Sequence, residues 1–161
     1  MKKLTIFLIL VFSFVSGCDE SSTPSKNKTD FYVKFQNLST SWFTISSIEL
    51  QAMGKVGVDD KPQGDWSDNI LKNGKRIAPG QHEFFYLEIP NLHSSACRLG
   101  VIDSAGVEIF LHQQNNFTQD WVNSITHWGG DTRTVSVEFI RNPLSNLISI
   151  KSWSDWVGIE D

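Results

Sequence analysis

The side chains best suited to bind a metal ion or to move a proton are four histidines, His82, His93, His112 and His127. No two of them are spaced i,i+2 or i,i+4, and the chain has no His-Glu-x-x-His motif. A zinc site would therefore need three or four ligands converging from separate segments, with one position left open for catalysis. The spacing instead favours histidines in solvent-facing turns and at strand edges, and we predict no metal site.

Signatures of nucleophilic and acid–base catalysis are missing as well. The chain has no Gly-x-Ser-x-Gly elbow and no cysteine spaced to pair with a histidine. Asp59-Asp60 and the pair Asp65 and Asp68 supply carboxylates, but not in the order of a calcium-binding loop. We therefore predict that the protein is not an enzyme and uses no cofactor.

Six tryptophans are the unusual feature of the composition. Indole rings are over-represented where proteins grip partners, and they can stack on sugars. The opposing interpretation is that they cap the open ends of a small core, because tryptophan is usually largely buried. Four of them lie in loop-like or tail sequence: Trp66, Trp128, Trp153 and Trp156. The candidate contact residues are Trp66, Trp121, His127 and Trp128.

Short strands must position these side chains, because apolar and polar residues alternate in brief segments separated by turn residues. The alternating segments cover residues 31–36, 47–52, 69–77, 84–89, 97–101, 107–111 and 135–139. Turns are predicted at Asn73-Gly74, Pro79-Gly80 and 103–106, whose residues suit tight backbone conformations. We predict an all-β fold, a small antiparallel β-sandwich of about seven strands, because two packed sheets bury strands that have one apolar face.

Two further segments belong to this fold. Cys97 lies in a strand pattern, so we predict that it is buried as a small apolar residue. Residues 142–161 are predicted to form a C-terminal tail packed on the domain. The tail is either a short helix, with Asn142 as its cap and Pro143 at its first position, or an edge strand around residues 148–150.

The N-terminus indicates export. Met1-Lys2-Lys3 precedes the apolar residues 4–15, a stretch too short to span a membrane but typical of a secretory signal. It ends in Val15-Ser16-Gly17-Cys18, which resembles the lipobox of bacterial lipoproteins. The resemblance implies cleavage before Cys18, lipidation of its thiol and an anchor in the lipid bilayer. Residues 18–29 offer no apolar surface to bury, so we predict a flexible tether.

The predicted organisation is a signal peptide at 1–17, the lipidated cysteine and tether at 18–29, the β-sandwich domain at 30–141 and the tail at 142–161. Asp19 and Glu20 resemble the signal that retains proteobacterial lipoproteins in the inner membrane. In another lineage an acidic run at this position resembles a surface-export signal. We expect a protein that faces the periplasm from the inner membrane, with the outer membrane or cell surface as the alternative.

The mature chain is acidic. Loss of Lys2 and Lys3 with the signal leaves 12 basic residues against 18 acidic ones, a net charge of −6. A nucleic-acid partner needs a basic patch for its phosphates, so this balance argues against one. It also argues against a polybasic contact with anionic lipid.

Residues 31–110 contain Asn37-Leu38-Ser39, a W-x-D-x-x-L turn at 66–71 followed by Gly80, and the Cys97 strand with its turn at 103–106. In this order they resemble small exported bacterial β-sandwich domains. The resemblance implies the fold and no activity. The lipid anchor, the long 54–65 loop and the C-terminal tail depart from the pattern of those domains.

The function expected from these observations is a membrane-anchored, non-enzymatic binding module that contacts another protein of the cell envelope. Two alternatives stay open. One is a domain that recognises envelope glycan through exposed tryptophans and acidic groups. The other is a hydrolase with a non-standard site.

Overall fold

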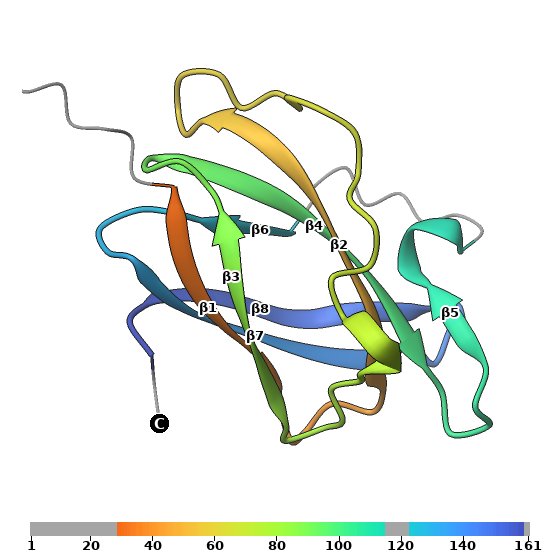
Figure 1. Cartoon of the computed structure of the whole chain (residues 1–161). Coiled ribbons are helices and arrows are strands. Elements are labelled where there is room, and N and C mark those ends of the chain that lie inside the picture. The colour runs from red at the N-terminus through yellow and green to blue at the C-terminus, as the bar shows by residue number, and fades with distance from the viewer. Residues whose placement is uncertain (1–28, 115–122, 160–161) are drawn as a thin grey trace, which may run out of the picture.

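The computed structural model describes residues 29–114 and 123–159, and eight strands make up most of them (Figure 1). The strands are β1 (Asp30–Asn37), β2 (Thr44–Lys55), β3 (His82–Glu88), β4 (His93–Ile102), β5 (Glu108–Phe110), β6 (Asn123–Thr126), β7 (Thr132–Arg141) and β8 (Ile148–Val157). Two short 3₁₀ turns complete the regular structure, η1 (Lys72–Gly74) and η2 (Leu111–Gln113). The predicted all-β sandwich is confirmed.

The strands form two four-stranded sheets. Sheet I has the order β3-β1-β7-β8, and in sheet II the central strand β4 pairs with β2, β5 and β6. Every pair is antiparallel except one, since β1 and β7 run parallel with Tyr32 opposite Thr132. The sequence prediction had no parallel pair. Alternation along a strand indicates which face is buried and says nothing of the direction of the neighbouring strand.

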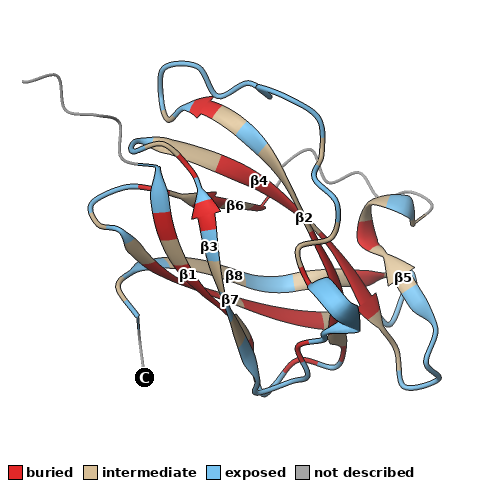
Figure 2. Cartoon of the chain, in the orientation of Figure 1, coloured by how far each residue is buried: buried red, intermediate tan, exposed pale blue. Residues whose placement is uncertain are grey.

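The core lies between the two sheets, where Figure 2 shows buried residues along the facing strands. On β1, Phe31, Val33 and Phe35 are buried, while Tyr32 between them points to the opposite face. The inward residues of β7 and of β4 follow the same alternation. Each such side chain contributes about 1.5–3 kcal/mol when it is fully buried, and this burial holds the layers together.

The predicted turns and the predicted core cysteine are also confirmed. Asn73 and Gly74 adopt positive φ angles of 60° and 69°, the conformation for which this dipeptide is suited. Cys97 is buried and is not in a disulfide. Burial raises the pKa of its thiol far above the ordinary value. The thiol is therefore held in its unreactive, protonated form.

Of the two alternatives for the tail, the structure has the strand. β8 pairs with β7 from Ile148 to Val157 and forms one edge of sheet I. Asn142 still acts as a local cap, because its side-chain oxygen accepts hydrogen bonds from the N–H groups of Leu144 and Ser145 at 2.9 and 3.2 Å. The cap closes a turn here and not a helix. Within the described residues, no helix has the length and hydropathy of a membrane span.

Candidate functional site

The predicted contact residues separate in the structure. Cys18, Asp19, Glu20 and Trp121 lie outside the described residues. His127 is 2% exposed, its ring stacks on Phe31 with centroids 4.4 Å apart, and its Nδ1 lies 2.5 Å from the carbonyl oxygen of Ile89. The structure therefore places His127 in the core, whereas its sequence context favoured a solvent-facing position.

Trp128 and Trp66 differ in their exposure to solvent. The side chain of Trp128 is 58% exposed on the turn between β6 and β7, and its carbonyl accepts a hydrogen bond of 2.6 Å from Nη2 of Arg133. Trp66 is half-buried, and the guanidinium of Arg98 lies 4.5 Å from its ring centroid. Trp66 covers a charge of its own chain, and Trp128 presents its ring to solvent.

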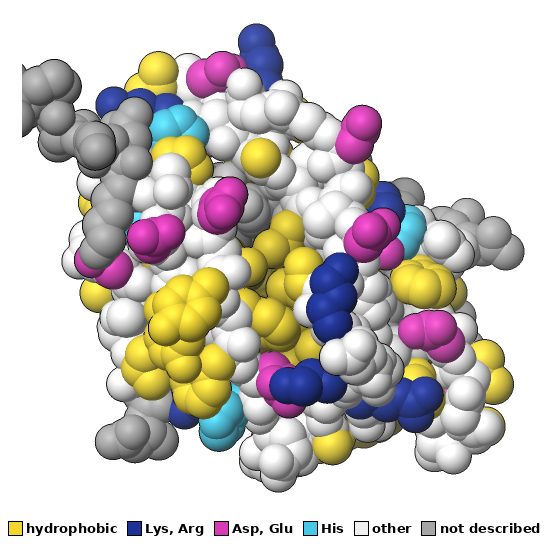
Figure 3. All heavy atoms as spheres, in the orientation of Figure 1, with side chains coloured by type: hydrophobic (Ala, Val, Ile, Leu, Met, Phe, Trp, Pro, Cys, Tyr) yellow, Lys and Arg dark blue, Asp and Glu magenta, His cyan; other side chains and the backbone are white. Residues whose placement is uncertain are grey.

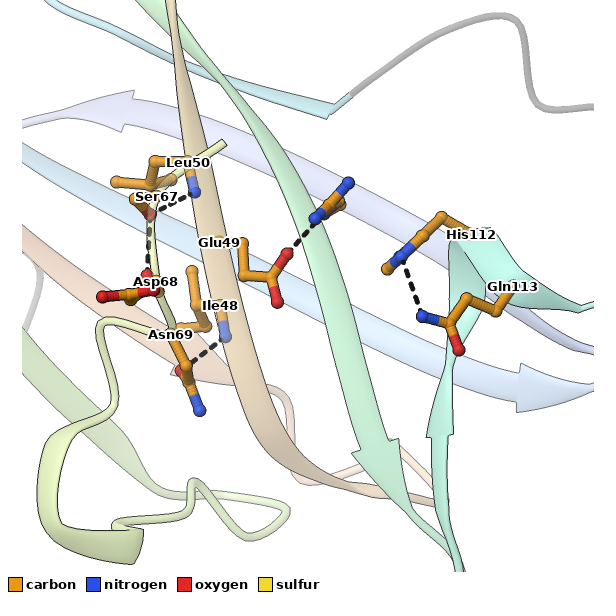
Figure 4. A network of polar contacts seen from close by, with 9 residues as sticks. Ile48, Glu49, Leu50, Ser67, Asp68, Asn69, His112 and Gln113 are labelled. Carbon is orange, nitrogen blue, oxygen red and sulfur yellow. Dashed lines mark hydrogen bonds and ion pairs between the residues drawn. The ribbon is translucent and has the colours of Figure 1, made fainter. Parts of the chain in front are cut away.

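The charge that Trp66 covers belongs to a network on the outer face of sheet II (Figure 4). Glu49 on β2 and Arg98 on β4 are register partners, and their side chains form an ion pair of 2.5 Å. His112 of η2 lies on the side of this ion pair that faces away from Ser67 and Asn69. Burial and the nearby Arg98 lower the pKa of His112, while Glu49 opposes them. Within this network Glu49 and Arg98 satisfy each other, whereas the buried Nδ1 of His112 has no hydrogen-bond partner among the described residues.

The W-x-D-x-x-L turn at 66–71 is held against the free edge of β2. Oγ of Ser67 accepts a hydrogen bond of 3.0 Å from the N–H of Leu50, and Oδ1 of Asn69 accepts one of 3.0 Å from the N–H of Ile48 (Figure 4). Uncovered strand edges invite pairing with other chains. We infer that this segment covers the edge of β2, so that its role is structural.

A second charged cluster, of Arg133 and Asp155, lies inside the sandwich beneath the turn that carries Trp128. Nε of Arg133 is 3.6 Å from Oδ1 of Asp155, and Oδ2 of Asp155 accepts a hydrogen bond of 2.9 Å from the N–H of Thr126. Burial raises the pKa of Asp155, and its effect exceeds the opposing effects of Thr126 and Arg133. This pair connects β6, β7 and β8 at one end of the domain.

The outer face of sheet I carries a different kind of surface. The alternation that buries one side of β1 and β3 sends Tyr32, His82, Phe84 and Tyr86 outward, and we call these four residues the aromatic ladder. Tyr32 and Phe84 stack with centroids 5.3 Å apart and planes 3° apart. Tyr86 lies 4.8 Å from Tyr32 on one side, and His82 lies 5.0 Å from Phe84 on the other.

The aromatic ladder is exposed. Tyr86 is 83% and Phe84 42% accessible, and Figure 3 shows the resulting hydrophobic patch over β1 and β3. The register continues from Phe84 through Lys34 and Thr134 to Trp156, which is 58% exposed on β8. Lys34 and Thr134 are buried although they are on the outer face. The aromatic rings of Phe84 and Trp156 thus flank Lys34 and Thr134 on the outer face of sheet I, and both rings are exposed to solvent.

Sequence reasoning missed this face, although a signal was present. The sequence predicts a strand at residues 84–89, but its contact candidates are three tryptophans and His127, and none of them lies on this strand. Phe84 and Tyr86 share one face of β3, while Phe85 and Leu87 share the other. An edge strand with aromatic residues on both faces has more apolar surface than one core can bury.

Among the described residues no group of three potential ligands is placed to hold a metal ion. No protein-family model matches the chain, and neither a curated protein nor a solved structure matches it. The candidate site is therefore defined by this chain's own surface, and the aromatic ladder is its most exposed cluster of interacting rings within the described residues.

Proposed function

We propose that this chain is a lipid-anchored, non-enzymatic binding module of the cell envelope, and that it contacts a partner protein through the aromatic ladder. The observation that carries the proposal is a row of four rings, each in contact with the next, of which Tyr86 is 83% and Phe84 42% exposed. The anchor at Cys18 is part of the proposal and rests on the lipobox resemblance.

The physical argument concerns preorganisation. Tyrosine and phenylalanine supply large contact areas and have few side-chain torsions to immobilise on binding. In the ladder, ring-to-ring contact already restricts those torsions in the free protein, which lowers the entropic cost of association. Contiguous exposed apolar patches on soluble domains commonly mark interaction sites. A rigid aromatic face on a sheet is therefore suited to binding and does not by itself supply chemistry.

The test is photo-crosslinking in living cells with the full-length lipoprotein. Benzoylphenylalanine replaces Tyr86 in one strain and, as a control, Val58, which is 76% exposed in the loop after β2. We expect a discrete protein adduct from position 86 and none from position 58. A second substitution, Phe84→Ser, should abolish the adduct while the melting temperature and circular dichroism confirm that the domain is folded.

Three results would count against the proposal: equal adducts from both positions, no adduct from position 86, or an adduct that survives Phe84→Ser. Cosedimentation with purified envelope glycan provides the other arm. Glycan binding that is lost in Phe84→Ser, without any protein adduct at position 86, would replace the protein partner by the glycan-recognition alternative.

A further inference from the structure

Two carboxylates extend the aromatic ladder at one end. Asp30 and Glu88 are register partners, next on the outer face to the register pair Tyr32 and Tyr86. Both carboxylate residues are exposed, and Figure 3 shows acidic side chains beside the hydrophobic patch. Within the described part of the chain neither carboxylate has a hydrogen-bond or ion-pair partner.

This arrangement costs the free protein stability. Directly opposed residues of an antiparallel pair have Cβ atoms about 4.5–5.5 Å apart, and like charges in that position are destabilising. A cation that bound between Asp30 and Glu88 would relieve the repulsion. Asp30 and Glu88 therefore favour a positively charged binding partner. An apolar or anionic partner would leave both carboxylates desolvated and unpaired.

The rings beside the carboxylates have the same preference. The face of a tyrosine or phenylalanine ring attracts an ammonium or guanidinium group within about 6 Å of its centroid. Tyr86 is 83% exposed, so its ring is open to such contact. Lys34, which lies opposite Phe84 on this face, is only 6% exposed, so it does not offset the negative surface charge at the end of the ladder.

We infer that the partner presents lysine or arginine side chains to the aromatic ladder, with their charges at Asp30 and Glu88 and their apolar stems along Tyr86. Long basic side chains suit this surface because their methylene stems pack on apolar groups while the charged ends stay polar. The net charge of the mature chain would steer a basic partner toward it. The inference names the partner chemistry of the proposed binding face and rests on that proposal.

Binding of defined probes to the full-length lipoprotein in lipid nanodiscs tests the inference. The probe is a fluorescent peptide of alternating lysine and glycine, and its counterpart of equal length has glutamate in place of lysine. Measurements are made at low ionic strength, where charge screening is weakest. The test variant is Asp30→Asn with Glu88→Gln. The matched control, Asp65→Asn with Glu108→Gln, removes the same net charge from exposed residues outside the ladder.

We expect the lysine peptide to bind and the glutamate peptide not to bind. The test variant should weaken binding about tenfold, and the control variant less than about twofold. Because repulsion is relieved, the test variant should also melt about 2 °C higher than the wild type. Equal loss in both variants, binding of the glutamate peptide, or a lower melting temperature in the test variant would overturn the inference.

Failure of the inference and failure of the proposed function give different results. If the crosslink at position 86 forms equally well in the Asp30→Asn, Glu88→Gln background, the face binds a partner that is not basic. In that case the proposed function stands and the charge inference falls. If no crosslink forms at position 86 in any background, the proposed function falls, and the inference falls with it.

Discussion

Truncation of Asp155 to alanine should lower the free energy of unfolding by about 3–5 kcal/mol, because it leaves the charge of Arg133 inside the sandwich without a carboxylate. Only 8% of the Arg133 side chain and 15% of the Asp155 side chain are exposed, and Nε and Oδ1 lie 3.6 Å apart. The truncation also removes the acceptor of the Thr126 N–H. A fully buried unsatisfied donor costs about 1–3 kcal/mol, and the partly buried Thr126 N–H should add less than that.

Removal of both charges should have a much smaller effect. The pKa of Asp155 lies above its ordinary value of 3.8 because burial disfavours the ionised carboxylate more than Arg133 and Thr126 stabilise it. The pair is thus not fully compensated for its desolvation, and buried pairs of this kind are often replaced by apolar residues at little cost. The double variant Arg133→Met, Asp155→Leu should therefore be more stable than Asp155→Ala by at least about 2 kcal/mol.

The sign of the pH dependence follows from the same shift. A carboxyl whose folded pKa is raised contributes stability below its unfolded pKa, and this contribution is lost as the pH rises through the folded pKa. In wild-type protein, the contribution of Asp155 to the free energy of unfolding should therefore fall as the pH rises from its ordinary pKa of 3.8 to its raised folded pKa. The double variant lacks this group, and its stability relative to wild type should increase across that interval.

The assay is urea unfolding followed by tryptophan fluorescence, with the midpoint and slope fitted for each variant. Glu108→Ala, at an exposed residue of β5, is the matched control and should change the free energy of unfolding by less than about 0.5 kcal/mol. A loss below about 1 kcal/mol in Asp155→Ala would refute the argument. A double variant no more stable than the single one would refute it too.

Four further predictions concern the rest of the chain. Trp128→Ala should lower the free energy of unfolding by about 1 kcal/mol or less, because its ring is 58% exposed, and a loss above about 3 kcal/mol in urea unfolding would show a buried ring. Cys97 should resist a thiol-specific reagent in the folded protein and react fully in denaturant, since burial raises its pKa. A sandwich labelled equally fast in both conditions would contradict this. Cys18→Ser should remove acylation and detergent-phase partitioning, whereas Asp19→Ser with Glu20→Ser should move the protein to the outer-membrane fraction of a proteobacterium; fractionation and mass spectrometry test both.

The sequence predicts the fold well because the alternation of apolar and polar residues indicates which face of each strand is buried. Phe31, Val33 and Phe35 alternate with polar residues, and all three are buried between the sheets. It leaves the conformation of the tail at 142–161 undecided, since Ile148 fits both a short helix that begins at Pro143 and an edge strand at 148–150. Pairing with β7 settles that choice, and the pairing depends on contacts distant in sequence.

The candidate site is less predictable, because the exposure of a side chain depends on residues that are distant in sequence and pack against it. Trp66 looks in the sequence like a free indole in a loop, but Arg98, more than thirty residues later in the chain, packs against it. His127 sits beside Trp128, yet the stacking on Phe31 draws it into the core. The aromatic ladder itself needs the β1–β3 register, which brings Tyr32 beside Tyr86 and cannot be read from either strand alone.

The position of Asp30 links the proposed face to the predicted anchor. Asp30 is the first residue of β1 and one of the two carboxylates at the end of the aromatic ladder. If Cys18 carries the predicted lipid and residues 18–29 form the predicted flexible tether, the root-mean-square span of the tether is about 20 Å, and this end of the ladder would stay close to the bilayer. Anionic headgroups repel carboxylates and attract basic segments over the same short range. The membrane surface would then repel the acidic end of the ladder and prevent it from lying flat on lipid. The same surface would concentrate basic partners, the class that we infer binds at this end.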